Sequence, residues 1–154
     1  MFGMEEQGDA VNKPQHYRDH EVFSGQCLDY TARMGFLGGN AFKYCWRHRY
    51  KGKPLEDLDK AIFYVNWRTS NESYDRKRFS NQLTAEDRCR LYNEWMEFTA
   101  NHPDKVTESL ANATYAMIAL AAGARAGETV DAYLGRVLIY LTKARAAAEA
   151  ELNQ

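Results

Sequence analysis

Apolar residues recur at intervals of three and four along most of the chain, which is the spacing of one face of an α-helix. The clearest stripe is Leu55, Leu58, Ile62 and Val65. Similar stripes follow it: Leu91, Trp95 and Phe98; Val106, Leu110, Ala113, Met117 and Leu120; Val130, Leu134, Val137 and Leu141. No segment shows the alternation of a β-strand. The pattern therefore predicts an all-α fold, a compact bundle of about five to six helices.

Capping residues and glycines suggest where the first two helices begin and end. Ser24 is a candidate N-cap for a helix that runs to about Met34. The glycine-rich stretch 35–39 then predicts a break in the chain, because glycine is a poor helix former. A second helix is expected from about Asn40 to Gly52.

The later helices have clearer start signals. Pro54 suits the first turn of a third helix, and Thr84 with Asp87 resembles the capping box that opens a fourth. A polar stretch separates these two helices. The expected organisation is a flexible N-terminal segment at 1–20, a helical motif region at 21–69, and an additional helical region at 70–154 packed on it.

Two parts of the chain resemble each other. "GNAFKY…LEDLDKAIFYV" and "ANATYA…VDAYLGRVLIYL" both place Asn-Ala near a helix start and end in an amphipathic helix with aromatic and aliphatic residues. One interpretation is a worn repeat that gives two helical-hairpin halves. Chance similarity between two helical hairpins is an equally good explanation. Under the first interpretation, only the first copy keeps the basic residues.

Composition narrows the class of protein. The chain has 154 residues and a formal net charge of −1, which argues against a protein that coats nucleic acid through its overall charge. The three cysteines form no CxxC pair, so we expect no disulfide framework or zinc knuckle, and a reducing compartment. No run approaches the roughly 18 apolar residues of a membrane span. We therefore expect neither membrane nor nucleic acid as a partner.

Positive charge is concentrated between Asn40 and Tyr64, where seven residues are Lys, Arg or His. A helical wheel separates the predicted second helix into two faces. The polar face holds Asn40, Lys43, Tyr44, Arg47 and Lys51, and the opposite face holds Phe42, Cys45 and Trp46. The wheel leaves His48 off the polar face, as a solvent-exposed charge.

On the third helix, Asp57, Lys60 and Tyr64 line up beside the apolar stripe. Because a short turn at 52–54 would make the two helices antiparallel, their polar faces could converge into one cleft. Arginine matches phosphate oxygens with a planar fork, and lysine adds a compact charge, so the cleft suits a phosphorylated ligand. The alternative is two solvated helix faces, with Asp57 and Lys60 as an ordinary helical pair.

Three segments carry a family resemblance: "KPQHY" at 13–17, "GNAFKYCWRHRYKGK" at 39–53 and "EDLDKAIFY" at 56–64. They resemble the SaV-like family of small bacteriophage proteins. The matching positions are Pro14, His16, Tyr17, Gly39, Asn40, Lys43, Tyr44, Arg47, Asp57, Leu58, Lys60, Ala61 and Tyr64. The resemblance covers 12–68 and leaves 70–154 without a counterpart.

A characterised relative in that family is a phage nucleotide kinase that phosphorylates deoxynucleoside monophosphates without a P-loop and forms large oligomers. The resemblance implies a nucleotide ligand, ATP as phosphate donor, Mg²⁺, a homo-oligomer, and a location in the cytoplasm of the infected bacterial host. The sequence likewise contains no GxxxxGK[ST]. Catalysis would then rest on positioning and charge neutralisation.

The resemblance also assigns roles to residues. The catalytic set would be Lys43, Arg47 and Lys60, as phosphate binders, with Asp57 either holding the metal ion or orienting an arginine. The nucleotide-binding set would be Asn40, Tyr44 and Tyr64, with His16 and Tyr17 closing over the site.

Two other functions stay open. MazG-like pyrophosphohydrolases hold magnesium with paired carboxylates, and "EWME" (Glu94, Glu97) and "ETVD" (Glu128, Asp131) are such pairs. Helix capping explains the second pair equally well. Alternatively, the protein is an anti-defence protein that binds a host protein or a nucleotide signal. The aromatic "RLYNEWMEF" would be its surface, although helical spacing favours a core role for these aromatics.

Overall fold

The computed structural model describes residues 20–70 and 83–154, and every regular element in these ranges is helical. The elements are α3 (Leu28–Thr31), α4 (Phe36–Arg47), α5 (Pro54–Ser70), α6 (Ala85–Asn101), a 3-10 turn (Pro103–Lys105), α7 (Glu108–Ala122) and α8 (Val130–Leu152). The all-α prediction is confirmed. His16, Tyr17 and most of the expected N-terminal segment lie outside the described residues.

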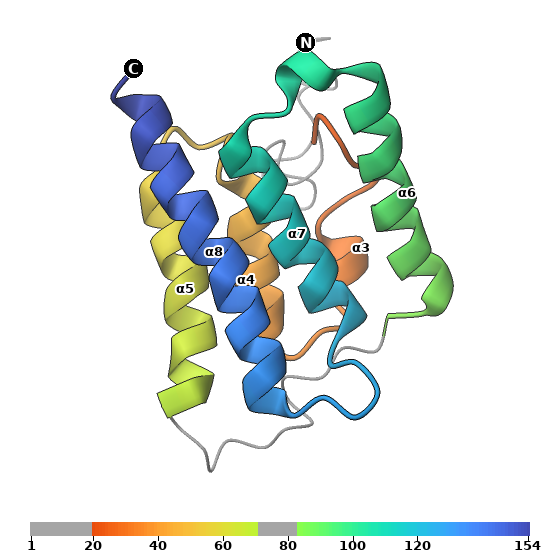
Figure 1. Cartoon of the computed structure of the whole chain (residues 1–154). Coiled ribbons are helices and arrows are strands. Elements are labelled where there is room, and N and C mark those ends of the chain that lie inside the picture. The colour runs from red at the N-terminus through yellow and green to blue at the C-terminus, as the bar shows by residue number, and fades with distance from the viewer. Residues whose placement is uncertain (1–19, 71–82) are drawn as a thin grey trace, which may run out of the picture.

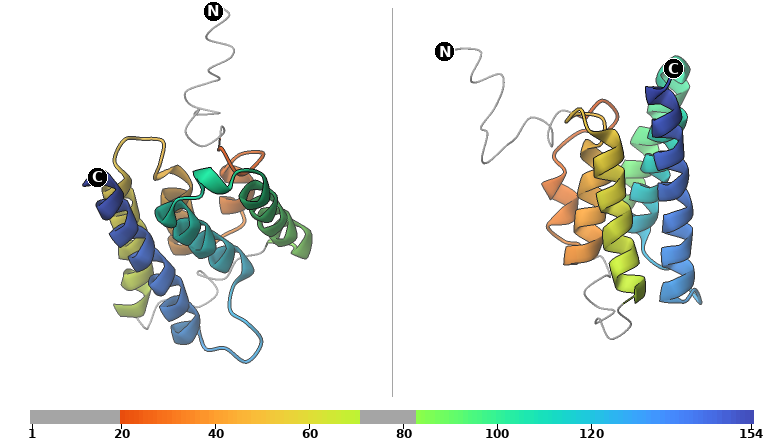
Figure 2. Two further views of the ribbon diagram at one scale, coloured as in Figure 1. Left: turned by 45° about the horizontal axis from the view of Figure 1, so that its top comes forward. Right: turned by 90° about the vertical axis from the view of Figure 1, so that its left-hand side faces the viewer.

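Four helices form the body of the molecule as two antiparallel hairpins (Figure 1). One hairpin consists of α4 and α5, and the other of α7 and α8. The hairpins face each other so that α4 packs on α7 and α5 on α8, which Figure 2 shows as two layers. Helix α6 packs against α7 on the side away from α5. The chain therefore has two hairpin halves, as the internal similarity indicates.

The two hairpins share a detail at equivalent positions. Asn40 is the fifth residue of α4, and its side-chain amide donates to the Phe36 carbonyl at 2.8 Å. Asn112 is the fifth residue of α7, and its amide donates to the Glu108 carbonyl at 2.9 Å. Each asparagine side chain thus donates a hydrogen bond to the carbonyl of the first residue of its own helix. The sequence similarity is matched by a structural one.

Aromatic side chains from α3, α4 and α6 dominate the main core. Trp46, Phe42 and Tyr30 are fully enclosed, with exposures of 0%, and Trp95 is 1% exposed. A second, smaller cluster joins Leu58 to three alanines of α7 and α8: Ala113, Ala144 and Ala148. The small side chains let α5 approach the other hairpin closely. The predicted apolar stripes all face this core, and none of the helices in the described ranges is long and apolar enough to cross a membrane.

Threonines cap the starts of the three C-terminal helices. The side chains of Thr84, Thr107 and Thr129 each accept a hydrogen bond from the backbone N–H three residues later. The predicted capping role of Thr84, opposite Asp87, is confirmed at 3.1 Å. A cap of this kind typically contributes about 1 kcal/mol.

The first two predicted helices have different bounds from those expected. Helix α3 covers only 28–31, and Ser24 bonds to Glu94 instead of capping it. Helix α4 begins at Phe36 and includes two buried glycines that were predicted to break the chain. A Cβ at Gly39 would lie 3.5 Å from Met34 and from the Thr31 carbonyl. Tertiary packing of α4 on α3 therefore outweighs the poor helix propensity of glycine.

His20, the first residue that the structure describes, is surrounded by aromatic rings. Its ring contacts those of Phe23, Trp46 and Tyr50 at 4.7–5.3 Å between centroids. Its Nδ1 accepts hydrogen bonds from the backbone N–H groups of Val22 and Phe23. Burial, with smaller contributions from His48 and Arg49, lowers the pKa of His20 to about 3. The folded protein therefore holds this imidazole neutral.

We predict that the protein loses stability in mild acid through His20. Below its ordinary pKa of about 6.5, the imidazole gains a proton only in the unfolded chain, so stability falls as pH drops from about 6.5 toward 3. The expected loss at about pH 5.5 is about 1.4 kcal/mol relative to pH 7.5. The second buried imidazole, His48, adds to it, because burial also lowers its pKa. Urea denaturation at the two pH values measures the effect.

The control for this prediction is His20→Asn, whose side-chain oxygen can replace Nδ1 as the acceptor. This variant should be less stable than the parent at pH 7.5 but should show a shallower pH dependence. Between pH 7.5 and 5.5 the carboxylates with lowered pKa stay largely ionised in both the folded and the unfolded protein, so they do not interfere with this comparison. If the stability of His20→Asn falls with pH as steeply as that of the parent protein, the loss in mild acid does not come from His20.

Candidate functional site

The polar faces of α4 and α5 meet around the ring of Tyr44. The side-chain nitrogens of Lys43 and Lys60 lie 4.5 and 5.4 Å from its centroid, and the guanidinium carbon of Arg47 lies 4.7 Å from it. Tyr64 of α5 stacks on the same ring, with centroids 6.0 Å apart and planes 10° from parallel. The structure therefore brings together the residues that the sequence predicts to converge.

A buried ion pair fixes the arrangement. The Nε and Nη2 atoms of Arg47 donate to Oδ1 of Asp57 at 3.2 and 3.1 Å. The side chains are 12% and 3% exposed. The pair joins the last turn of α4 to the first turn of α5, where the carboxylate also suits the positive helix end. Of the two roles considered for Asp57, the geometry favours orienting the arginine.

The Asp57 environment does not fit a magnesium ion. Mg²⁺ keeps several waters and requires an open octahedral shell. The Asp57 carboxylate is almost fully enclosed, and the Arg47 guanidinium lies against it. Within 20–70 and 83–154, no group of three or more His, Cys, Asp or Glu side chains could hold a metal ion. The described residues therefore provide a cluster of cations around Tyr44 without a group of side chains that could hold a metal ion beside it.

The two lysines differ in their partners. Lys60 pairs with Glu56 at 3.0 Å, and this hydrogen bond raises the pKa of Lys60 and lowers that of Glu56. Lys43 forms no ion pair with any described residue, and only the Tyr44 ring contacts its ammonium group. Lys43 is therefore the cation of this cluster that is most available to a ligand.

A cavity of about 300 Å³ opens beside Lys43, between α3 and the first half of α4. Its lining consists of Thr31, Met34, Gly35, Phe36, Gly39, Asn40 and Lys43. The sequence indicated only Asn40 and Lys43 of this set. The others are apolar or small residues whose role depends on the packing of α3 against α4, which helical periodicity does not reveal.

Two basic residues of the cluster lie elsewhere than expected. His48 is buried at 2% exposure, and its Nδ1 lies 2.6 Å from the Cys45 carbonyl, so it is not the solvent-exposed charge that the wheel predicted. Lys51 lies beyond the end of α4 and does not extend the polar face. The site is thus confined to the residues around Tyr44 and the adjoining cavity.

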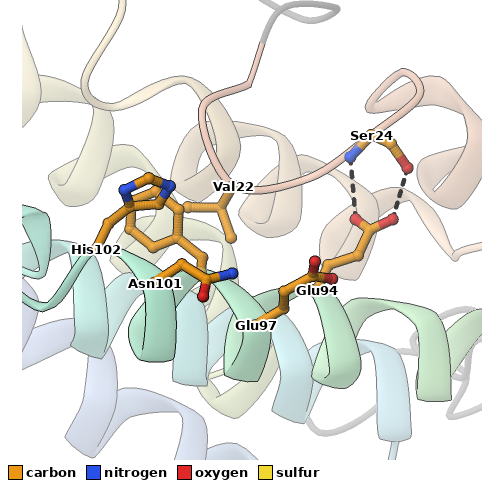
Figure 3. Close-up of a pocket in the computed structure, with 7 residues that line it drawn as sticks. Val22, Ser24, Glu94, Glu97, Asn101 and His102 are labelled. Carbon is orange, nitrogen blue, oxygen red and sulfur yellow. Dashed lines mark hydrogen bonds between the residues drawn. The ribbon is translucent and has the colours of Figure 1, made fainter.

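The carboxylate pairs considered for a pyrophosphohydrolase have separate environments. Glu94 accepts hydrogen bonds from the backbone N–H and the hydroxyl of Ser24, at 2.9 and 2.5 Å (Figure 3). It lines a pocket of about 320 Å³ with Glu97. Glu128 instead binds Arg136 at 2.9 Å. Because α7 lies between α6 and α8, the two pairs do not face each other (Figure 1).

The aromatic segment of α6 serves mainly the core. Leu91, Trp95 and Phe98 are buried, as their spacing predicts. Tyr92 and Met96 are 52% and 48% exposed on the outer side. A host-protein surface at α6 stays a prediction that depends on these two side chains.

Comparison with known proteins gives one match. Residues 11–66 match a family described as proteins of unknown function (DUF3310). The match covers just over a third of the chain and includes α3, α4 and most of α5, together with all the residues predicted for the site. No curated protein and no solved structure matches the chain. The SaV-like resemblance stays a prediction, because the matching family's description states no function.

We predict that removing only one partner of the Arg47–Asp57 ion pair strongly lowers the stability of the folded protein. Asp57→Leu leaves a largely buried guanidinium without its counter-ion and should lower the free energy of unfolding by about 3 kcal/mol or more. Adding Arg47→Met in the same chain should recover a large part of this loss, because no unpaired charge then stays buried. Urea denaturation of the two single variants and the double variant measures the coupling.

Asp59→Leu provides a matched control on the same helix. Asp59 forms an ion pair with Arg145 at 3.0 Å, but it is 54% exposed. Its loss should cost less than about 1 kcal/mol. Similar losses for Asp57→Leu and Asp59→Leu would contradict the structural role given to the buried pair.

Proposed function

We propose that this protein is a phage nucleotide-binding protein, a nucleoside monophosphate kinase-like enzyme that holds the phosphate of its ligand at Lys43, Arg47 and Lys60. The single observation that carries the proposal is the gathering of these three cations around one tyrosine ring, at 4.5–5.4 Å. They come from two helices; among the described residues, Arg47 pairs with Asp57 and Lys60 with Glu56.

Clustered cations suit an anionic ligand for an electrostatic reason. Like charges a few ångströms apart repel each other, and near a protein surface the repulsion amounts to several kcal/mol per pair before solvent screening. The ring of Tyr44 offsets part of this cost through cation–π attraction. A phosphate group would offset more, because its oxygens accept charge-assisted hydrogen bonds from lysine and arginine side chains.

The neighbourhood favours a nucleotide over a bare phosphate. Two stacked tyrosines, the Asn40 amide and the cavity beside Lys43 provide aromatic surface and hydrogen-bonding groups next to the cations. The resemblance to the SaV-like family supports the same ligand class. It also supports a phage origin, a homo-oligomer and a location in the host cytoplasm, which belong to the proposal for that reason alone.

The proposal includes kinase activity, which is a more specific claim than nucleotide binding. An enzyme without a P-loop would transfer the phosphoryl group by positioning the two substrates and neutralising charge. Arg47 suits this role because Asp57 holds its planar guanidinium in one orientation. The donor would be ATP with Mg²⁺. The described residues provide no enclosed carboxylate site for that ion, so no step is assigned to it.

We predict that dTMP or dGMP raises the unfolding temperature of the purified protein. A ligand at about 100 times its dissociation constant adds about 2.7 kcal/mol to the stability of the folded state. Lys43→Ala should abolish most of this shift without lowering the stability of the free protein, since Lys43 forms no ion pair with a described residue. A thermal-shift titration with and without Mg²⁺ measures both effects.

The control for charge is Lys143→Ala, which removes one exposed lysine from α8. It should leave the nucleotide shift unchanged. If no nucleotide shifts the unfolding temperature of the parent protein, the proposed function is wrong.

Turnover requires its own measurement. We predict that the protein with ATP and Mg²⁺ converts a deoxynucleoside monophosphate to the diphosphate, and that Arg47→Lys reduces the rate by about tenfold or more, because lysine cannot make the paired hydrogen bonds of the guanidinium. Binding without turnover would favour a protein that sequesters a nucleotide signal. Release of pyrophosphate that Glu97→Gln abolishes would favour the pyrophosphohydrolase instead.

A further inference from the structure

The cavity beside α3 continues the cationic face toward the start of α4. Phe36, Asn40, Lys43 and Arg47 follow one another at intervals of three and four residues, so they form one stripe along the helix. At a rise of about 1.5 Å per residue, Asn40 lies about 4.5 Å along the axis from Lys43 and about 10 Å from Arg47. Lys43 both lines the cavity and contacts the Tyr44 ring. A ligand with its phosphate at the cations could therefore place its other end in the cavity.

Asn40 offers a defined pair of hydrogen-bonding groups at the cavity. An asparagine side chain has two N–H donors and one carbonyl acceptor. One N–H of Asn40 is bonded to the Phe36 carbonyl at 2.8 Å, which fixes the orientation of the amide. One N–H donor and the carbonyl acceptor are left for a ligand. The edge of a nucleobase presents the complementary pair, and asparagine reads adenine in this way in DNA complexes.

The rest of the lining suits a flat aromatic ligand. Phe36 is 68% exposed at the cavity, with its ring edge-on to Tyr64 at 6.0 Å. Base–aromatic stacking is tolerant of base identity. Gly39 brings no side chain, and a Cβ there would lie only 3.5 Å from Met34 and from the Thr31 carbonyl. A side chain at this position would therefore occupy part of the space between α4 and the Thr31–Met34 segment.

We propose that this cavity is the subsite for the nucleobase, with the Asn40 amide bonded to the base edge and Phe36 stacked against its face. The inference rests on the proposed function and goes beyond it, because it assigns the ligand's recognition to its base as well as to its phosphate. Asn40, Phe36 and Gly39 are then specificity-determining residues. Sugar phosphates that lack a base should bind more weakly, because they make no contact in the cavity.

The test compares dTMP and dGMP with 2-deoxyribose 5-phosphate, which keeps the phosphate and lacks the base. Isothermal titration calorimetry of the full chain should show the nucleotides binding at least about tenfold more tightly. Asn40→Ala should weaken nucleotide binding by about tenfold or more and leave the affinity for 2-deoxyribose 5-phosphate within about twofold.

The second hairpin provides the matched control. Asn112 makes the same bond to its own helix, at 2.9 Å, but no cationic stripe follows it on α7. Asn112→Ala should therefore cost the folded protein about as much stability as Asn40→Ala and leave both ligand affinities unchanged. Equal loss of nucleotide and sugar-phosphate binding in Asn40→Ala would overturn the base-reading role.

Gly39→Ala tests the cavity in case Asn40→Ala does not fold. The added methyl group meets its neighbours at ordinary contact distance, and alanine is the better helix former, so the unfolding temperature should stay level or rise. Nucleotide affinity should fall while the affinity for the sugar phosphate holds. Equal binding of both ligands by the parent protein would overturn the base subsite alone. Failure of both ligands to bind would overturn the phosphate site itself.

Discussion

The buried ion pair between Arg47 and Asp57 is the interaction on which the site depends. Removing two charges from water costs several kcal/mol for each ion, and only short, well-directed contacts offset this. Two guanidinium nitrogens lie 3.1 and 3.2 Å from Oδ1 of Asp57 and offset part of this cost, while the buried Oδ2 has no hydrogen-bond partner among the described residues. Because the partners lie on α4 and α5, the pair also restricts how the two helices slide along each other. The positions of Lys43 and Lys60 around Tyr44 follow from this register.

The sequence predicted this part of the structure because its signals are local. The stripe from Leu55 to Val65 sets the orientation of α5, and the turn at 52–54 is too short for anything but an antiparallel neighbour. A helical wheel then places Lys43 and Arg47 on the face that meets Lys60. Every step of that inference involves residues within about two helical turns of one another or joined by the turn.

What the sequence could not predict depends on contacts between distant segments. Helix α4 extends back through Gly39 because α3 packs closely against that glycine. Ser24 is held by Glu94, seventy positions away, and not by the helix that it precedes. The burial of His48 likewise follows from the position of α4 between its neighbours. The cavity beside Lys43 is formed by contacts of this kind, so the sequence alone does not predict it.

The two hairpins divide structural and chemical roles between them. Both carry the same asparagine anchor near a helix start, but only α4 continues into a row of cations. The second hairpin presents alanines to α5, which permits close packing without any charge. Repulsion among the cations opposes their clustering, but Asp57 offsets the charge of Arg47, and Glu56 offsets that of Lys60. In the proposed complex, an anion would meet side chains that these ion pairs already hold in place, so binding would require little ordering of the site.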